Sequence, residues 1–246
     1  MKNILPFLTL SIFLSCSNTP SSQQVVDAAI KASGSEKLLS SEVSFTFRGV
    51  TYTYTRSEGN YTFSRVRKDT FNNEMKDILT NNGLVRYVNQ VETDITSEKR
   101  DAYAASVNSV IYFAFLPLGL NDNAVNKSYI SKVNIKGKQY HKIKVTFNQE
   151  GGGEDYEDVF YYWFDTEDFS MDYLAYSYNE EDGKGMRFRE AFNSRLINGV
   201  VIQDYKNLKP KVKGSVSLEQ IDQAYINEGL EELSLIELKD IRIMLN

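Results

Sequence analysis

The chain has 246 residues, of which 41% are apolar and 25% are charged, a balance typical of a globular protein with one domain. The net charge of -5 argues against a broad surface for nucleic-acid phosphates, and a single cysteine and a single histidine exclude an internal disulfide and most zinc sites. The 16 tyrosines and 14 phenylalanines favour half-buried β-strands.

The first 15 residues have the features of an export signal. Lys2 precedes an apolar stretch at 4–14 that is too short to span a bilayer but fits the core of a signal peptide. The single cysteine, Cys16, follows at once, and the segment SIFLSC resembles a bacterial lipobox. The resemblance implies a signal peptide at 1–15 and lipid attachment at Cys16. The alternative is a plain secretory signal with a chance cysteine.

The segment after Cys16 bears on location. Residues 16–21 are polar and have the composition of a flexible tether, and we expect residues 22–246 to form one domain. Ser17 and the absence of acidic residues directly after Cys16 favour, by analogy with lipoproteins of Gram-negative bacteria, an outer-membrane anchor facing the periplasm.

The first predicted elements are a short helix and a series of hairpins. Ser21 or Ser22 can cap a helix over 22–33, and Gly34 can end it. The apolar stripe of this helix consists of Val25, Val26, Ala29 and Ile30. Alternation of apolar and polar residues, interrupted by turn residues, then predicts strands at 42–48, 51–55 and 61–68 and a hairpin over 74–89.

The middle of the chain changes to a helical period. From Ser97 to Phe115 the apolar residues recur at helical spacing, and Pro117 stops the helix. The end of this segment, IYFAFLPLGL, is nearly all apolar, so we expect it to be buried in the core or to line an apolar cavity.

The chain then returns to strands, which gives about ten in total. VFYYWF at 159–164 is apolar on both faces, which predicts a central strand or one covered by the helix. Ser217 and Gln220 predict a capping box for a short helix bearing Leu218, Ile221 and Tyr225 on one face. The further strands are predicted at 129–135, 140–147, 173–178, 186–192, 200–208 and 233–243.

The order of these elements resembles the LolA/LolB-like lipoprotein-carrier superfamily. The second half resembles a family of bacterial lipoproteins of unknown function that is related to this fold. The residues that carry this resemblance are YHKIKVTF (140–147), EGGGEDYEDVFYYWF (150–164), YLAYSY (173–178), GMRFREAF (185–192) and GVVIQDYKN (199–207). The resemblance implies an α+β fold, mostly antiparallel β: a curved, unclosed β-barrel that wraps a central helix and can hold acyl chains. It implies no catalytic residues.

Several side chains that could carry chemistry have a plainer structural interpretation. His141 shares a strand face with apolar residues and the chain has no G-x-S-x-G motif, so we interpret the imidazole as structural or cavity-lining. The acids and glycines within 150–158 match neither a calcium loop nor a phosphate loop. We interpret them as a solvated loop, and no carboxylate pair suited to glycoside hydrolysis stands out.

The strand arginines have two interpretations. Arg187 and Arg189 share one face of a strand. These two and Arg56, Arg65, Arg67 and Arg86 either pair with nearby acids at the surface or form a cationic rim that meets a lipid headgroup or a phosphate.

These features predict a non-enzymatic lipoprotein that binds a hydrophobic or lipid ligand, with no cofactor, metal or nucleic acid. The alternative is an accessory or scaffold lipoprotein with a filled core that acts through protein contacts. An enzyme that uses acidic residues is a third hypothesis, and no motif favours it. The candidate ligand-lining residues are Phe45, Phe47, Tyr103, Val107, Ile111, Phe115, Val145, Phe147, Trp163 and Phe188.

Overall fold

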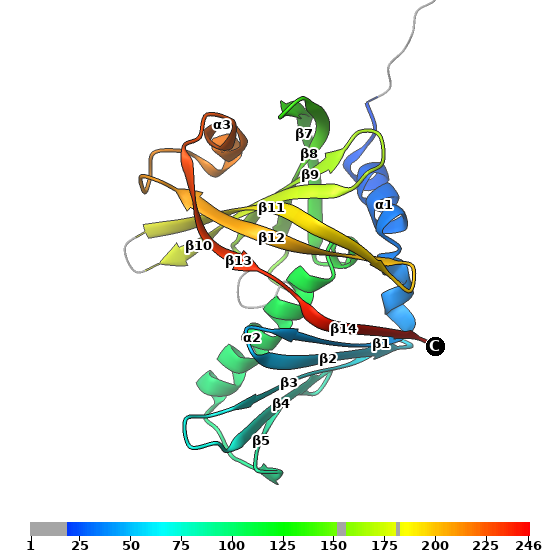
Figure 1. Ribbon diagram of the computed structural model, residues 1–246, viewed down its shortest axis with the longest axis vertical. Helices are drawn as coiled ribbons and strands as arrows, with labels where there is room; N and C mark the ends of the chain where they lie inside the picture. The colour runs from blue at the N-terminus through cyan, green and yellow to red at the C-terminus, as the bar shows by residue number, and fades with distance from the viewer. Residues whose placement is uncertain (1–18, 152–155, 181–182) are drawn as a thin grey trace, which may run out of the picture.

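The computed structural model describes residues 19–151, 156–180 and 183–246. Within these ranges the chain forms two antiparallel sheets of seven strands each and three α-helices (Figure 1). No helix in this part of the chain is both long and apolar enough to cross a membrane.

In each sheet, neighbouring strands are consecutive in the chain, apart from the pairing of β14 with β1 in the first sheet. The first sheet has the order β14 (Lys239–Leu245), β1 (Ser41–Phe47), β2 (Val50–Ser57), β3 (Asn60–Lys68), β4 (Glu74–Thr80), β5 (Gly83–Val88) and β6 (Val91–Glu92). The second has the order β13 (Leu230–Ile236), β12 (Val200–Pro210), β11 (Gly183–Ile197), β10 (Met171–Glu180), β9 (Val159–Asp165), β8 (Lys138–Phe147) and β7 (Val125–Ile135).

The prediction of one strand over 233–243 is wrong, because this segment divides between the two sheets. β13 ends at Ile236 as the edge of the second sheet, and β14 begins at Lys239 as the edge of the first. At the crossing, the backbone N–H of Leu238 donates to Asp204 Oδ1 at 3.0 Å. Because β6 and β7 lie at the far edges of their sheets, the strands form a curved, unclosed barrel, and the described chain has 14 strands rather than about ten.

The helix predicted at 22–33 is confirmed as α1 (Ser22–Ser33). Ser21 caps it and forms a capping box with Gln24, and its four stripe residues are buried. Gly34 ends it with a φ of 64°. A Cβ at Gly34 would lie 2.1 Å from the carbonyl oxygen of Gly199, so this position requires glycine for close contact as well as for its backbone conformation.

The central helix α2 (Ser97–Ala114) lies in the chain between the two sheets and contacts both of them. It packs on β3, β4 and β5 of the first sheet. Its other end reaches the second sheet, where the hydroxyl of Tyr112 forms a 2.8 Å hydrogen bond with that of Tyr162 on β9. The helix ends before Pro117, as predicted, and the 3-10 helix η2 (Leu118–Asn121) follows.

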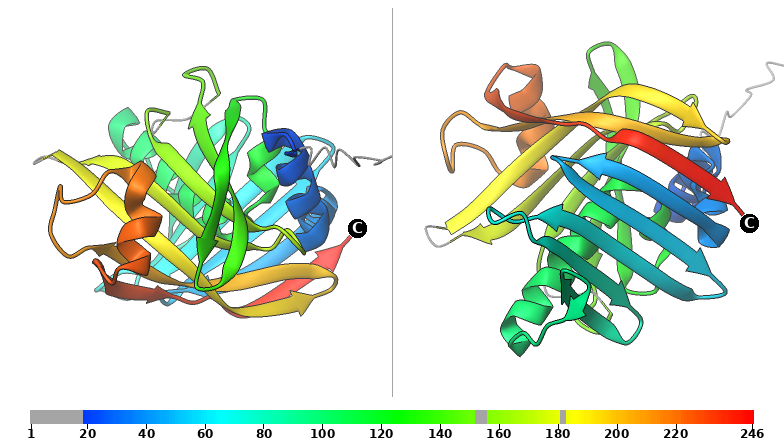
Figure 2. Two further views of the ribbon diagram at one scale, coloured as in Figure 1. Left: turned by 90° about the horizontal axis from the view of Figure 1, so that it is seen from above. Right: turned by 60° about the horizontal axis from the view of Figure 1, so that its bottom comes forward.

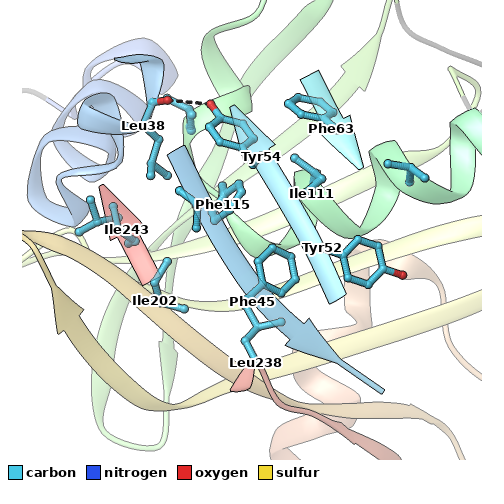
Figure 3. Packing of buried hydrophobic residues seen from close by; sticks show 14 of the residues in the cluster. Leu38, Phe45, Tyr52, Tyr54, Phe63, Ile111, Phe115, Ile202, Leu238 and Ile243 are labelled. Carbon is cyan, nitrogen blue, oxygen red and sulfur yellow. Dashed lines mark hydrogen bonds between the residues drawn. The ribbon is translucent and has the colours of Figure 1, made fainter. Parts of the chain in front are cut away.

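Three buried clusters fill the molecule. The first joins the first sheet to α2, and Figure 3 shows Phe45, Tyr54 and Phe115 packed together within it. The phenol of Tyr54 also donates to the carbonyl of Leu38 in the 3-10 helix η1 (Ser35–Ser40) at 2.8 Å. The second cluster joins the inner face of the second sheet to α1 and η2, so α1 closes one end of the barrel (Figure 2).

The third cluster covers the opposite face of the second sheet. It contains Trp163, Phe188 and Tyr225, the last from α3 (Ile221–Ile226), which follows the 3-10 helix η3 (Leu218–Gln220). In Figure 1, α3 lies above this sheet and α2 lies below it. The prediction that VFYYWF forms a central strand is therefore confirmed, because β9 lies between β10 and β8. The second cluster covers one of its faces and the third cluster, with α3, covers the other.

The capping box predicted at Ser217 takes another form. Ser217 makes no side-chain hydrogen bond to the helix backbone, and its hydroxyl donates to the Gln220 side chain at 3.3 Å. The apolar face predicted for this segment, Leu218, Ile221 and Tyr225, is buried.

Candidate functional site

Two cavities lie on either side of α2, inside the curve of the barrel. The larger is an open cleft of about 1070 Å³, walled by side chains from both sheets, from α2 and from the segment after it. The smaller has a volume of about 270 Å³ and lies between α2, β1 and the strands β12 and β13. Four side chains border both spaces and separate them: Ser109, Phe113, Tyr176 and Arg189.

Aromatic rings form much of the cleft wall. On the second sheet, Phe160 contacts Tyr176 with ring centroids 5.3 Å apart and Phe147 at 5.6 Å. On the first sheet, Tyr54 stacks on Phe63 at 5.1 Å. These rings come from alternate positions of their strands, which is why they share the concave face. The wall can therefore exclude water from an apolar ligand.

A buried ionic cluster holds the first half of α2 on the first sheet. Asp77 of β4 accepts from Arg65 of β3 at 2.7 Å and from Arg86 of β5 at 2.6 Å. The ring of Tyr103 lies over the Arg86 guanidinium at 3.7 Å, and Arg65 donates to the hydroxyl of Ser106 at 2.8 Å. This cluster contributes to the position of the helix that divides the two cavities.

The strand arginines do not behave as one group. Arg65 and Arg86 are buried and form ion pairs with Asp77, so they belong neither to the surface nor to a cationic rim. Arg67 is exposed, whereas Arg56 and Arg189 line the cleft. Arg187 is half-buried beside the ring of Tyr178. Of these strand arginines, Arg189 is the one that borders both cavities.

The predicted lining residues fall into three groups. Ile111, Phe115 and Phe147 line the larger cleft, and Phe47 lines the smaller cavity. Behind the walls, within the first two clusters, lie the buried side chains of Phe45, Val107 and Val145.

The structure corrects the prediction for the other three lining residues, which border neither cavity. Tyr103 lies over Arg65 and Arg86 and borders neither cavity. Trp163 and Phe188 point to the opposite face, under α3. Because strand side chains alternate between faces, the neighbours of opposite parity, Phe160 and Arg189, are the ones that line the cleft.

Sequence reasoning also missed lining residues that the tertiary structure brings together. Tyr54 and Phe63 lie on predicted strands, and their alternation with polar residues was the signal that could have found them. Phe113, Phe160 and Tyr176 come from segments apolar on both faces, where alternation carries no information.

The imidazole of His141 is buried away from the two cavities. Its Nδ1 lies 3.1 Å from the hydroxyl of Tyr129, and its ring stacks on Phe169. Burial, followed by the nearby charge of Lys132, lowers the pKa of His141 below its ordinary value. These contacts fit a structural imidazole.

Two of the predicted features lie partly or wholly outside the described residues. Cys16 lies wholly outside them, and the acidic loop predicted at 150–158 lies outside them at residues 152–155. Among the residues that the structure does describe, no three His, Cys, Asp or Glu side chains are grouped to hold a metal ion.

Comparison with known proteins identifies the class and then the family. The fold is similar to that of a LolA superfamily protein from Nitrosomonas europaea, whose crystal structure aligns with a TM-score of 0.52 and 9% identity, covering 91% of this chain and 94% of that one. A DUF1329 family protein from Desulfovibrio piger aligns at 0.44 with 12% identity, covering 91% and 93%.

The chain belongs to the family described as a family of unknown function, DUF6503, whose model matches residues 2–239. No curated protein matches the sequence. The resemblance drawn from the sequence, to a family of unknown function with a LolA-like fold, is thereby confirmed.

Proposed function

We propose that this protein binds a hydrophobic or lipid-like ligand in the cleft between its two sheets and catalyses no reaction on it. The observation that carries the proposal is the open cleft of about 1070 Å³, whose wall combines aromatic and aliphatic side chains from both sheets and α2 with polar and charged residues such as Arg56 and Asp122. Ligand sites are typically apolar concavities of about 300–1,000 Å³ with a few polar groups. A cleft of this size and lining fits such a ligand.

The energetics favour an acyl chain. Each methylene group moved from water into an apolar site contributes about 0.8 kcal/mol. A chain of ordinary fatty-acid length therefore gains enough from burial along the Phe147, Phe160 and Tyr176 wall to offset the cost of association.

The location is part of the same proposal. A signal peptide at 1–15 would direct export and be removed. A lipidated Cys16 and a tether at 16–21 would then hold the domain at 22–246 on the outer membrane, facing the periplasm. A binding protein anchored there would meet apolar ligands leaving or entering the bilayer. Incorporation of labelled palmitate in cells tests the attachment, and label retained in a Cys16→Ser variant would contradict it.

Native mass spectrometry of the segment Ser17–Asn246, purified without detergent, tests ligand binding. This segment contains both sheets and all the described helices, so it keeps the whole core. The expected result is a co-purifying lipid mass that disappears on denaturation.

A pair of variants on α2 locates the ligand. Ser109 borders both cavities, so Ser109→Trp should fill the space and remove the bound mass. Ala102→Trp, at an exposed position of the same helix that borders neither cavity, should keep it. A clean ligand-free mass, with no uptake of added fluorescent fatty acid, would contradict the proposal and favour a scaffold that acts through protein contacts.

A further inference from the structure

Arg189 is a buried cation at the centre of the binding region. It lies on β11, borders both cavities and is 8% exposed. The ring of Phe113 lies 3.9 Å from its guanidinium carbon, and its Nη2 donates to the hydroxyl of Tyr176 at 3.0 Å. Among the described residues, these contacts of Arg189 are therefore with aromatic, uncharged side chains.

The charge of Arg189 has no counterpart within the described residues. The other buried lysine and arginine side chains there each meet an aspartate: Arg65 and Arg86 meet Asp77, and Lys142 meets Asp222. No described carboxylate lies within 4.0 Å of Arg189, although acidic residues line other parts of the cleft. A buried charge without a partner is costly to the folded state, so an external anion would stabilise this arrangement.

A second polar group without a hydrogen-bond partner, the side-chain oxygen of Asn207, lies directly opposite Arg189. Arg189 pairs with Asn207 across β11 and β12, so their side chains share a face. Arg189 Nε and Asn207 Oδ1 are the two buried side-chain polar atoms of the described chain that have no hydrogen-bond partner. Both residues border the smaller cavity. One ligand bound in the smaller cavity could therefore supply hydrogen-bond partners to both residues.

The chemistry of these two groups selects an anionic oxygen ligand. A guanidinium binds carboxylate or phosphate oxygens through parallel N–H groups. Asn207 Nδ2 donates to Ser234 Oγ at 3.2 Å, and because that hydroxyl can also donate, the amide can turn and present its N–H groups to an anion. The acidic residues Asp101 and Glu157 in the larger cleft favour a singly charged head over a doubly charged phosphate.

We propose that Arg189 and Asn207 bind the carboxylate of a single-chain fatty acid whose tail lies in the adjoining cleft. This inference rests on the proposed function, since it assigns the head group of the ligand bound there. Arg189 borders both spaces, so a carboxylate at its guanidinium can direct a tail along the aromatic wall of Phe113 and Phe160.

Titration of Ser17–Asn246 with palmitate, hexadecanol and hexadecyl phosphate tests the assignment. Arg189→Met should weaken palmitate binding about 10- to 100-fold, the effect of losing a charge-assisted hydrogen bond, and leave hexadecanol binding unchanged. Arg67→Met, at an exposed arginine that borders neither cavity, is the matched control and should change neither.

Asn207→Asp gives a second, independent test. A carboxylate placed opposite Arg189 would pair with it from within the protein. We therefore expect a higher unfolding temperature without ligand and weaker palmitate binding. This variant keeps the volume of the wild-type side chain, so a packing defect does not explain the loss.

The outcomes separate the two proposals. Binding of palmitate and hexadecanol that Arg189→Met leaves unchanged would overturn the head-group assignment and keep the cleft as the binding site. Equal weakening of both ligands would also overturn it, because the arginine would then act on cavity shape. Tighter binding of hexadecyl phosphate than of palmitate would overturn the choice of a carboxylate. Failure of all three to bind wild-type protein would overturn the proposed function itself.

Discussion

The carboxylate of Asp77 compensates the charges of two buried arginines, Arg65 and Arg86. Burial by itself would raise the pKa of its carboxyl, but the hydrogen bonds from Arg86 and Arg65 outweigh burial and lower the pKa below its ordinary value. The side chain of Asp77 is 2% exposed. The face of Tyr103 covers Arg86, so a residue of α2 completes the site. One carboxylate therefore links three strands and a helix.

Asp77→Asn should destabilise the protein by about 3–5 kcal/mol, because it leaves two buried guanidinium groups without an anion. Urea unfolding gives the free energy of unfolding. Asp94→Asn, at an exposed position, is the control and should change it by no more than about 0.5 kcal/mol. A change below about 1 kcal/mol for Asp77→Asn would show that the cluster is dispensable.

At the scale of elements, α3 covers the outer face of the second sheet and so allows that face to be apolar. Asp222 of α3 accepts from Lys142 Nζ at 3.0 Å and from Trp163 Nε1 at 3.2 Å. Phe188 stacks on Tyr225 of the same helix with centroids 4.6 Å apart. Without this cover, Trp163 and Phe188 would be exposed. The cover also keeps the outer face separate from the cleft.

Asp222→Ala should cost about 3–5 kcal/mol, because Lys142 loses its buried counterion. The double variant Lys142→Met/Asp222→Leu should cost less than this single change, since it removes both charges. Trp163 is the sole tryptophan, so its fluorescence during urea unfolding reports on this site directly. A double variant less stable than Asp222→Ala would contradict this account.

At the scale of the whole molecule, the two sheets form one curved surface because the chain crosses between them at Leu238. Asp204 holds this crossing: it accepts from the Leu238 N–H and from Arg195 at 2.6 and 2.9 Å. Burial would raise the pKa of Asp204, but the hydrogen bonds from Arg195, Leu238 and Asn193 outweigh it and lower the pKa. The joint between the sheets therefore depends on an ionised carboxylate.

Stability should fall in two steps on acidification. The folded state lowers the pKa of His141 below 6.5, so the unfolded chain binds the proton more readily and stability decreases as the pH falls below about 6.5. The second step comes from Asp77 and Asp204, whose pKa values are lowered in the folded state. Their contribution to stability is fully present above about pH 3.8 and is lost as the pH falls through the pKa values of the folded state.

Urea unfolding at a series of pH values checks this dependence. The difference between wild type and His141→Gln isolates the imidazole from every other titrating group. We expect that difference to change between pH 7 and pH 5 and then to level off. A difference independent of pH would contradict the role assigned to burial of His141.

Local patterns in the sequence determined the elements. The capping residues and apolar stripe of 22–33 specify α1, because both are read within one or two turns. The period change at Ser97 and the stop at Pro117 similarly define α2. The alternation at 42–48 placed Phe45 on the buried face, because polar neighbours mark the other side. These are short-range interactions, so the chain carries them without its fold.

Only the tertiary structure decided which face of a fully apolar strand meets the cleft. Trp163 and Phe160 look alike in the sequence, and the position of α3 separates them. The division of 233–243 between two sheets depends on pairing with strands far away in the chain. The pairing of Arg65 with Asp77, and the unpartnered Nε of Arg189 among the described residues, follow from the same long-range register. Charge compensation is a property of neighbours in space, and the fold alone supplies those neighbours.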